Sequence, residues 1–322
     1  MKKYILALAV CFNLVSCDDA AITVVDSIGK IKDVVIVVEN DLWEGAVGDT
    51  LRNNLAKPVD GLIRDEPVFT LNQIKPASFE GLLKKSRNYI FVQLGKKESV
   101  SIRKDAYANP QTGVVITAPN QTALARLIGQ NASNIIEVLT TAEITEKQRL
   151  MEKVRMDAKP FQDQLGISIV IPKAYRYAKT EKDFLWIRKT IAEGTMDLMF
   201  YEVPLEAIQR DSSVVSQIVR VRDSVGGKHI EVNEPGVFQT EPMFSPYLHE
   251  VAVAGQFAYE TKGTWEVKNM FMAGPFVNYA IYNPKKKNWL IAEGYVSAPN
   301  SEQRNYMFEL EAILKSIEFI DK

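Results

Sequence analysis

The last third of the chain alternates short apolar segments with turn residues and then ends in an amphipathic segment. Five strands are expected between Tyr247 and Ser297, separated by glycines and by Asn283-Pro284. Strands of this length with a turn signal between neighbours are typical of an antiparallel meander. In the final segment, Tyr306 and Leu310 recur at helical spacing and predict a helix with one buried stripe. The sequence therefore predicts a meander that packs against a terminal helix.

The first half of the chain also predicts strands. Val34–Val38 is a continuous β-branched run, which is typical of a strand buried on both faces. Tyr89–Leu94 and Val100–Lys104 are expected to form a hairpin through the intervening Gly95-Lys96-Lys97. Val114–Thr117 predicts a further strand.

Helix starts are predicted from capping residues. Asp41 and Glu44 have the spacing of a capping box ahead of an apolar stripe. Asn120 and Asn300 each follow an Ala-Pro pair, and each is expected to cap the helix after it. The charged, periodic stretch Thr145–Met156 predicts a separate second helix in the first half.

These elements together predict an α+β protein. It has two strand-rich halves with flanking helices, and an α/β/α sandwich is one form that this arrangement can take. The expected organisation is a signal peptide (1–16), a tether (17–32), an N-terminal α+β half (33–159) and a C-terminal α+β half (160–322). The boundary between the two halves is placed at Lys159-Pro160.

The first residues of the chain indicate its location. A cationic start, Met1-Lys2-Lys3, precedes the apolar run Tyr4–Phe12. This run is much shorter than the roughly 20 residues of a membrane-spanning helix, so it predicts a secretory signal. Leu14-Val15-Ser16-Cys17 resembles the lipobox of bacterial lipoproteins. The resemblance implies cleavage after Leu14, Val15 and Ser16, lipidation of Cys17, and attachment to a membrane through that lipid.

Charge and cysteine content exclude several functions. The chain has 39 Lys+Arg and 40 Asp+Glu residues, so it has no basic footprint for nucleic acid. Cys11 lies within the expected signal, and Cys17 is expected to carry lipid. The mature chain would then have no thiol for catalysis, a disulfide or a thiolate metal site. We expect no cofactor and no metal.

Four residues are candidates for ligand binding. Trp186 and Arg188 alternate along one expected strand and therefore share a face, and Trp265 belongs to the aromatic-rich meander. An aromatic face with an arginine can bind a sugar, a peptide or a lipid headgroup, although aromatic residues more often build the core. His229 ends the expected flexible loop Gly226-Gly227-Lys228-His229, for which a plain exposed turn is the alternative.

Seven short stretches carry a family resemblance: Asn40–Gly45, Lys104–Ala108, Ala174–Ala178, Phe184–Arg188, Gly263–Val267, Met272–Phe276 and Arg304–Glu309. They resemble an uncharacterised lipoprotein family of the Bacteroidota, described as domain of unknown function 4837. The resemblance spans nearly the whole chain after Cys17. It implies an anchored envelope protein of a two-membrane bacterium, and it brings no activity or catalytic residues.

The sequence favours a non-enzymatic envelope lipoprotein. No nucleophile elbow, His-Glu-x-x-His motif or phosphate loop is present in the sequence. The expected location is the outer membrane, on its periplasmic face or at the cell surface, and the expected partner is an envelope protein, a glycan or a lipid. The alternative is an envelope hydrolase whose carboxylates meet His229 only in the folded protein. A cleft that joins acidic residues to His229 would favour the hydrolase.

Overall fold

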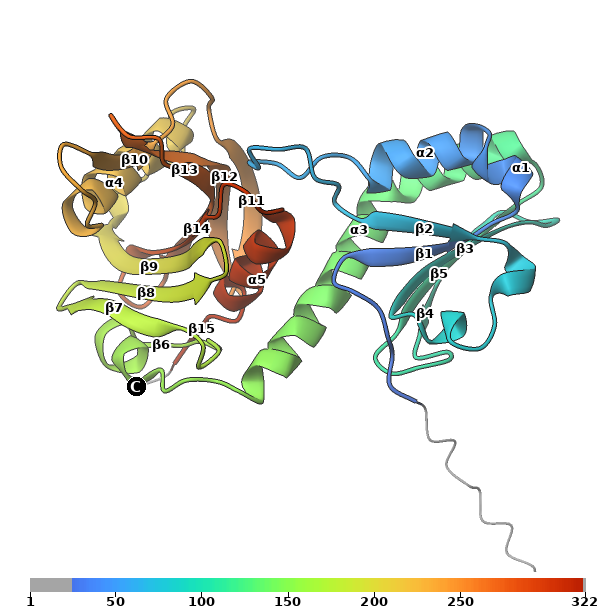
Figure 1. The fold of residues 1–322 in the computed structure, drawn as a ribbon, viewed down its shortest axis with the longest axis horizontal. Coiled ribbons are helices and arrows are strands. Elements are labelled where there is room, and N and C mark those ends of the chain that lie inside the picture. The colour runs from blue at the N-terminus through green and yellow to red at the C-terminus, as the bar shows by residue number, and fades with distance from the viewer. Residues whose placement is uncertain (1–24, 321–322) are drawn as a thin grey trace, which may run out of the picture.

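The structure is a computed structural model that describes residues 25–320. Figure 1 shows two strand-rich lobes joined by one long helix, α3 (Gln121–Glu152). The first lobe contains a five-stranded sheet and the second lobe an eight-stranded sheet. Helices flank the strands in both lobes, so the predicted α+β class is confirmed.

The first lobe is built on a mixed sheet. Its elements are β1 (Asp33–Val37), α1 (Asn40–Trp43), α2 (Ala46–Leu55), β2 (Thr70–Ile74), the 3₁₀ turns Pro76–Ser78 and Leu83–Lys85, β3 (Asn88–Leu94), β4 (Ser99–Lys104) and β5 (Thr112–Ala118). The strand order is β2-β1-β3-β5-β4, and β1 is parallel to both of its neighbours. Val34 and Ile36 pack beneath α2 and α3, whereas Val35 and Val37 pack with Phe79 on the other face. Burial on both faces explains the continuous β-branched run.

The predicted hairpin between β3 and β4 is wrong. β5 lies between these strands, parallel to β3 and antiparallel to β4. In β5 the side chains of Val114 and Ile116 are fully buried, while β4 is a mostly exposed strand. The apolar strand therefore takes the interior position and the polar strand forms the edge, where its charges discourage pairing with other chains.

The first helical region is two helices that break at Gly45. The predicted capping box of Asp41 and Glu44 is wrong, because neither helix has a side-chain hydrogen bond at its N-cap. A Cβ atom at Gly48 would lie 1.8 Å from the carbonyl oxygen of Trp43. The backbone of α2 thus lies too close to the end of α1 for any side chain at position 48, so this position requires glycine.

Helix α3 belongs to the cores of both lobes. It begins as predicted, because Asn120 Oδ1 accepts a 2.9 Å hydrogen bond from the helix backbone. Ile128 and Leu139 pack into the core of the first lobe, and Met151 packs into that of the second. The separate helix predicted for Thr145–Met156 is wrong, since α3 continues without a break to Glu152. Its final turns are stabilised by the second lobe.

The second lobe is an antiparallel sheet between two helices. Its elements are the π-helical turn Phe161–Leu165, β6 (Ile167–Ser168), β7 (Arg176–Glu181), β8 (Phe184–Ile191), β9 (Gly194–Pro204), the 3₁₀ turn Leu205–Ala207, α4 (Val214–His229), β10 (Val237–Thr240), β11 (Tyr247–Val253), β12 (Gln256–Lys268), β13 (Ala273–Asn283), β14 (Asn288–Ser297), α5 (Arg304–Leu314) and β15 (Glu318–Phe319). The order is β10-β12-β13-β14-β9-β8-β7, and β11 also pairs with β12. Phe276 packs with Ile218 of α4, whereas its neighbour Val277 packs with Leu310 of α5. The predicted meander with its terminal helix is confirmed, and this lobe has three α/β/α layers.

The predicted cap of the last helix is wrong. Asn300 lies before the start of α5, whose N-cap residue Gln303 makes no side-chain cap bond. The carboxylate of Glu66, from the first lobe, accepts hydrogen bonds from the backbone nitrogens of Gln303 (2.6 Å) and Arg304 (2.9 Å). A residue far away in the sequence therefore satisfies the helix N-terminus.

Residues 25–32 were expected to belong to the tether but contact the folded body. Isolated parallel bridges join this segment to the first lobe. The ammonium of Lys32 lies 4.8 Å from the ring centroid of Phe69 and 4.7 Å from that of Phe308. The predicted lipidation and cleavage residues lie outside the described residues: Cys17, Leu14, Val15 and Ser16.

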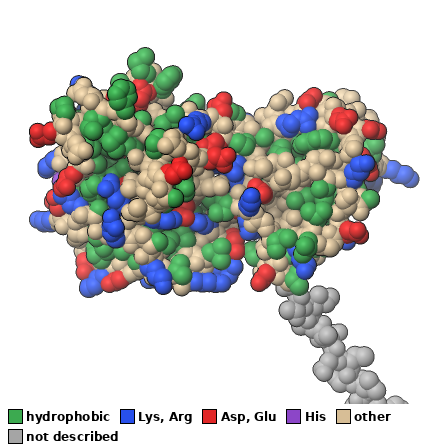
Figure 2. Space-filling model, viewed as in Figure 1, with side chains coloured by type: hydrophobic (Ala, Val, Ile, Leu, Met, Phe, Trp, Pro, Cys, Tyr) green, Lys and Arg blue, Asp and Glu red, His purple; other side chains and the backbone are tan. Residues whose placement is uncertain are grey.

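The described surface carries both signs of charge. Figure 2 shows acidic and basic side chains interspersed with apolar ones over the visible face. No helix between residues 25 and 320 is long and apolar enough to cross a membrane. The expected boundary at Lys159-Pro160 lies between α3 and the π-helical turn.

Candidate functional site

A buried carboxylate organises the polar residues of β8 and β9. Asp197 is fully buried, and antiparallel pairing places it opposite Arg188. One oxygen, Oδ1, accepts hydrogen bonds from Trp186 Nε1 (2.8 Å) and Arg188 Nε (2.7 Å). The other, Oδ2, accepts a 2.7 Å hydrogen bond from the Thr195 hydroxyl. Three donors from two strands thus compensate the buried charge.

Electrostatics fix the orientation of Arg188. Burial raises the pKa of Asp197, against the opposing effects of Arg188 and the hydroxyl and indole donors. Burial would lower the pKa of Arg188, but Asp197 and the Tyr295 hydroxyl raise it above its ordinary value. The guanidinium carbon also lies 4.5 Å from the ring centroid of Trp186, at cation–π distance.

Arg188 lines a small pocket of about 190 Å³, which we call the Arg188 pocket. Its other principal lining residues are Thr195, Ile230, Glu231, Phe238, Val267, Trp265, Met272 and Tyr295. The Trp265 ring stacks on Phe238 with centroids 5.2 Å apart and meets Tyr295 edge-on at 5.6 Å. The Trp265 indole nitrogen donates a 3.1 Å hydrogen bond to the carbonyl of Val296. The aromatic wall is therefore rigid.

The glycine opposite Trp265 makes room for this wall. Gly274 pairs with Trp265 across β12 and β13. A Cβ atom at Gly274 would lie 2.8 Å from the indole nitrogen and 1.9 Å from the Val296 carbonyl oxygen. Only glycine allows the indole and the β14 backbone to approach so closely.

The chemistry of the Arg188 pocket suits binding. Arg188 contributes a partly exposed cation, with 31% of its side chain accessible, and most of the other lining side chains are apolar. The Tyr295 hydroxyl is buried and makes no well-formed hydrogen bond within the described residues, although it interacts electrostatically with Arg188. A fixed cation at an apolar wall is an arrangement that recognises an anion with an apolar body.

The structure brings together three of the four residues predicted to bind ligand. Trp186 and Arg188 meet at Asp197, and Arg188 and Trp265 line the same pocket. Trp186 and Trp265 are themselves buried, so they support the site as core residues. Sequence reasoning missed Asp197, because only the register of β8 against β9 places it beside Arg188.

His229 is not part of this pocket. It was expected in a flexible loop, but it is the last residue of α4. Its Nδ1 lies 2.7 Å from Glu181 Oε2, and its ring stacks on Phe184 with centroids 4.4 Å apart. Gly226 lies within α4, and the Phe238 ring packs 2.7 Å from the position that a Cβ atom would take there. The glycines serve helix packing, and the carboxylate that the structure places against His229 is that of Glu181.

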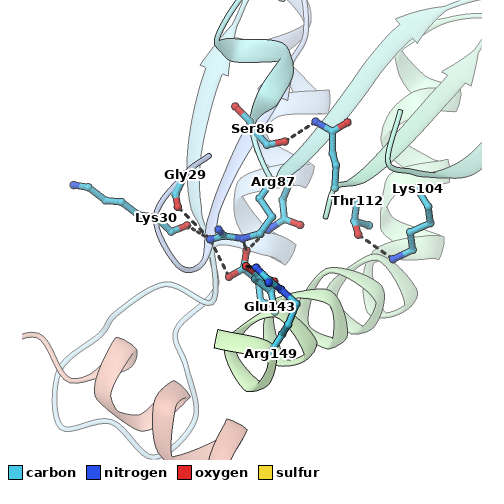
Figure 3. Close-up of polar contacts among 11 residues, drawn as sticks. Gly29, Lys30, Ser86, Arg87, Lys104, Thr112, Glu143 and Arg149 are labelled. Carbon is cyan, nitrogen blue, oxygen red and sulfur yellow. Dashed lines mark hydrogen bonds and ion pairs between the residues drawn. The ribbon is translucent and has the colours of Figure 1, made fainter. Parts of the chain in front are cut away.

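A second concave region, the interlobe cleft, lies between the lobes and has a volume of about 600 Å³. Figure 3 shows one of its walls, where Arg87 and Glu143 face each other. Arg87 Nε donates a 2.8 Å hydrogen bond to Glu143, and its Nη2 donates to the carbonyls of Gly29 and Lys30. Asn88 also donates to Glu143, which is almost completely buried.

Sequence reasoning also missed the interlobe cleft. Its one available signal was Glu143, an acidic residue four positions after Leu139 on the apolar stripe of α3. A larger pocket of about 860 Å³ lies around Arg155, Lys315 and the β13–β14 turn. None of the four candidate ligand-binding residues predicted from the sequence lines that larger pocket.

Three solved structures show a distant likeness to this chain. The Ran-binding protein Mog1p of Saccharomyces cerevisiae is 10% identical over 48% of this chain and 91% of its own, with a TM-score of 0.31. LpqN, involved in cell envelope biogenesis of Mycobacterium tuberculosis, is 12% identical over 47% of this chain and 82% of its own, with a TM-score of 0.27. Human StAR-related lipid transfer protein 5 is 7% identical over 53% of this chain and 94% of its own, with a TM-score of 0.25. Likenesses this weak support no conclusion about fold or function.

Family models divide the chain near the end of α3. No curated protein matches this sequence. Residues 27–152 match a domain of unknown function (DUF8532), and residues 154–316 match the domain of unknown function (DUF4837). The resemblance to DUF4837 was expected over nearly the whole chain, but the match covers only its second half. Two of the stretches that carried the resemblance, Asn40–Gly45 and Lys104–Ala108, lie in the DUF8532 segment. Since the other match covers just over half of the residues, the chain belongs to the family described as domain of unknown function (DUF4837).

Proposed function

We propose that this protein is a lipid-anchored protein of the bacterial cell envelope whose body binds a small ligand in the Arg188 pocket. The lipobox-like Leu14–Cys17 supports the anchor, and the outer membrane is the proposed location. A diacylglycerol with a further acyl chain gives lasting attachment, because each buried methylene contributes about 0.8 kcal/mol.

The pairing of Arg188 with Asp197 carries the proposed binding role. A buried carboxylate that accepts three hydrogen bonds holds the guanidinium before any ligand arrives. Ligand binding then requires little reordering of the site, which favours affinity. Glu231 at the rim is exposed and lies 3.4 Å from Lys179, so part of its negative charge is compensated.

The dimensions of the pocket indicate the ligand class. At about 190 Å³ it is smaller than the pockets of roughly 300–1,000 Å³ that hold drug-sized ligands. The cation suits a carboxylate, and Phe238, Trp265 and Val267 suit an apolar group next to it. We propose a small carboxylate with an apolar body, either free or as the last residue of a peptide.

Calorimetry of the purified full-length protein with small apolar carboxylates tests the site. Each carboxylate is compared with its uncharged amide, and a peptide with a free C-terminus is compared with its C-terminal amide. Carboxylates should bind at least tenfold more tightly than their amides. Arg188→Met should remove this preference, Arg188→Lys should weaken it, and Arg103→Met, at an exposed arginine on β4 of the first lobe, should leave it intact. Equal binding of acids and amides would refute the proposed ligand class.

The anchor is tested by acyl labelling and membrane fractionation. Cys17→Ser should lose the label and leave the membrane fraction. A variant that keeps both its label and its membrane location would exclude lipidation at this residue.

A further inference from the structure

The interlobe cleft has more positive than negative charge. Its lining residues include four cations, Lys30, Arg87, Lys147 and Lys189, and three carboxylates, Glu143, Glu146 and Glu309. Both lobes and the segment that precedes β1 contribute to this lining. A cleft shared by two lobes is a common place for a ligand site.

The excess positive charge lies around Glu309, on Lys147 and Lys189. Glu309 Oε2 lies 2.7 Å from the ammonium of Lys147 on α3, and its Oε1 lies 2.7 Å from that of Lys189 on β8. The Tyr175 hydroxyl donates a further 3.0 Å hydrogen bond to Oε1. One carboxylate therefore faces two ammonium groups, one from α3 and one from β8, and this cluster keeps a net charge of one positive unit.

The remaining carboxylates of the cleft are already engaged. Glu143 binds Arg87 and Asn88, and Glu146 accepts hydrogen bonds of 2.6 and 2.9 Å from Arg149. Figure 3 shows the Lys30 side chain extending away from the Arg87–Glu143 pair. The positive charge at Lys147 and Lys189 is therefore not neutralised by these neighbours. Partial burial of both lysines strengthens their attraction for an anion.

An apolar edge adjoins this charged region. Leu150 in the last turn of α3 and Val154 just after the helix both line the cleft, and they are 45% and 44% exposed. Ile31 and Met151 line the cleft beside them. Cations next to exposed aliphatic side chains match a molecule that has an anionic head and a hydrocarbon body.

We propose that the interlobe cleft binds an anionic phospholipid, with its phosphate beside Glu309 in contact with the Lys147 and Lys189 ammonium groups and its acyl chain along Leu150 and Val154. Lysine ammonium groups bind phosphate as point charges, and two of them can approach different phosphate oxygens. The apolar edge distinguishes a lipid headgroup from a soluble phosphate ester of the same charge. This site is separate from the Arg188 pocket and does not depend on it.

Native mass spectrometry of the full-length protein, purified in a nonionic detergent, tests the proposal. The protein is titrated with phosphatidylglycerol, with zwitterionic phosphatidylcholine and with sn-glycerol 3-phosphate. Phosphatidylglycerol should bind at least tenfold more tightly than either alternative, and added salt should weaken its binding. Equal binding of the zwitterionic lipid would overturn the charge assignment, and equal binding of glycerol phosphate would overturn the lipid assignment.

Variants separate the contributions of charge and apolar contact. Lys147→Met and Lys189→Met should each weaken phosphatidylglycerol binding about tenfold, while Lys153→Met, an exposed lysine beside the cleft, should not. The triple variant Lys147→Met, Lys189→Met, Glu309→Gln removes all three charges of the cluster together, so no charge is left buried without a partner. Its lipid binding can be measured even if one of the single variants does not fold. Leu150→Ser should weaken binding of the lipid but not of glycerol phosphate. Full binding by the triple variant would refute the site, and Arg188→Met should bind phosphatidylglycerol as the wild type does.

Discussion

Glu66 of the first lobe caps the helix that begins at Arg304 of the second lobe. The Glu66 carboxylate accepts a 2.9 Å hydrogen bond from the backbone nitrogen of Arg304, the first residue of α5. The Arg304 guanidinium returns to the first lobe and donates 2.9 Å to the Pro67 carbonyl and 3.1 Å to the Thr70 hydroxyl. A negative charge at the positive end of a helix is stabilising, and here it joins one lobe to the other.

Removal of this cap should destabilise the whole chain. Glu66→Ala leaves two backbone N–H groups without their acceptor, and we expect the free energy of unfolding to fall by about 1–2 kcal/mol. Urea denaturation followed by circular dichroism measures the loss. Asp65→Asn, at the exposed neighbouring residue, is the control and should change little. Equal losses in the two variants would show that the cap contributes nothing specific.

The Arg87–Glu143 pair should contribute far more than a surface pair. Glu143 is almost fully buried and Arg87 is only 13% exposed. Glu143→Ala would leave the Arg87 guanidinium buried without its carboxylate partner, so the free energy of unfolding should fall by about 3–5 kcal/mol. Glu98→Ala breaks the exposed pair with Arg126 and should cost less than about 1 kcal/mol. Comparison of the two unfolding midpoints checks this. The prediction fails if both variants lose the same stability.

The Arg222–Glu293 pair lies fully inside the second lobe. Arg222 Nε donates to both oxygens of Glu293, at 2.9 and 3.0 Å, and its guanidinium carbon lies 4.0 Å from the centroid of the Phe276 ring. Arg222→Met alone leaves a buried carboxylate and should cost about 3–5 kcal/mol. The double variant Arg222→Met, Glu293→Met should be more stable than this single variant. A double-mutant cycle by thermal unfolding measures the coupling, and additive losses would contradict the prediction.

Lys32 should make stability depend on pH in alkaline solution. Burial lowers its pKa from 10.5 to about 8, and Glu311 only partly opposes this. The unfolded chain therefore binds more protons between about pH 8 and 10.5, so the Lys32 contribution to stability rises with pH across this window. Below pH 8 the burial penalty is fully present.

Comparison with Lys32→Met isolates this effect, because the other titrating groups are common to both proteins. The stability of the wild type relative to the variant should rise by about 3 kcal/mol from pH 7.5 to 10.5. Urea denaturation of both proteins at intervals across this range provides the measurement. A constant difference would show that Lys32 does not change its charge there.

Local patterns predicted the elements that depend on nearby residues. The strand expected around Trp186 and Arg188 is β8, and both residues contact Asp197 from one face of it, as their spacing predicted. Asn120 capped α3 as expected, because an N-cap bond reaches only three residues along the chain. The predicted cap at Asn300 is wrong because the acceptor for the N-terminus of α5 is Glu66, which lies far away in the sequence and in the other lobe.

The amino-acid sequence by itself determined the α+β class, the strand-rich halves and the meander closed by a helix, because apolar periodicity and turn residues act within a few positions. Only the tertiary structure decided that β5 separates β3 from β4, that α3 serves both cores, and that Asp197 holds Arg188. These features depend on strand order, register and contacts between the lobes. Burial and charge compensation between distant residues select them, and no local pattern encodes them.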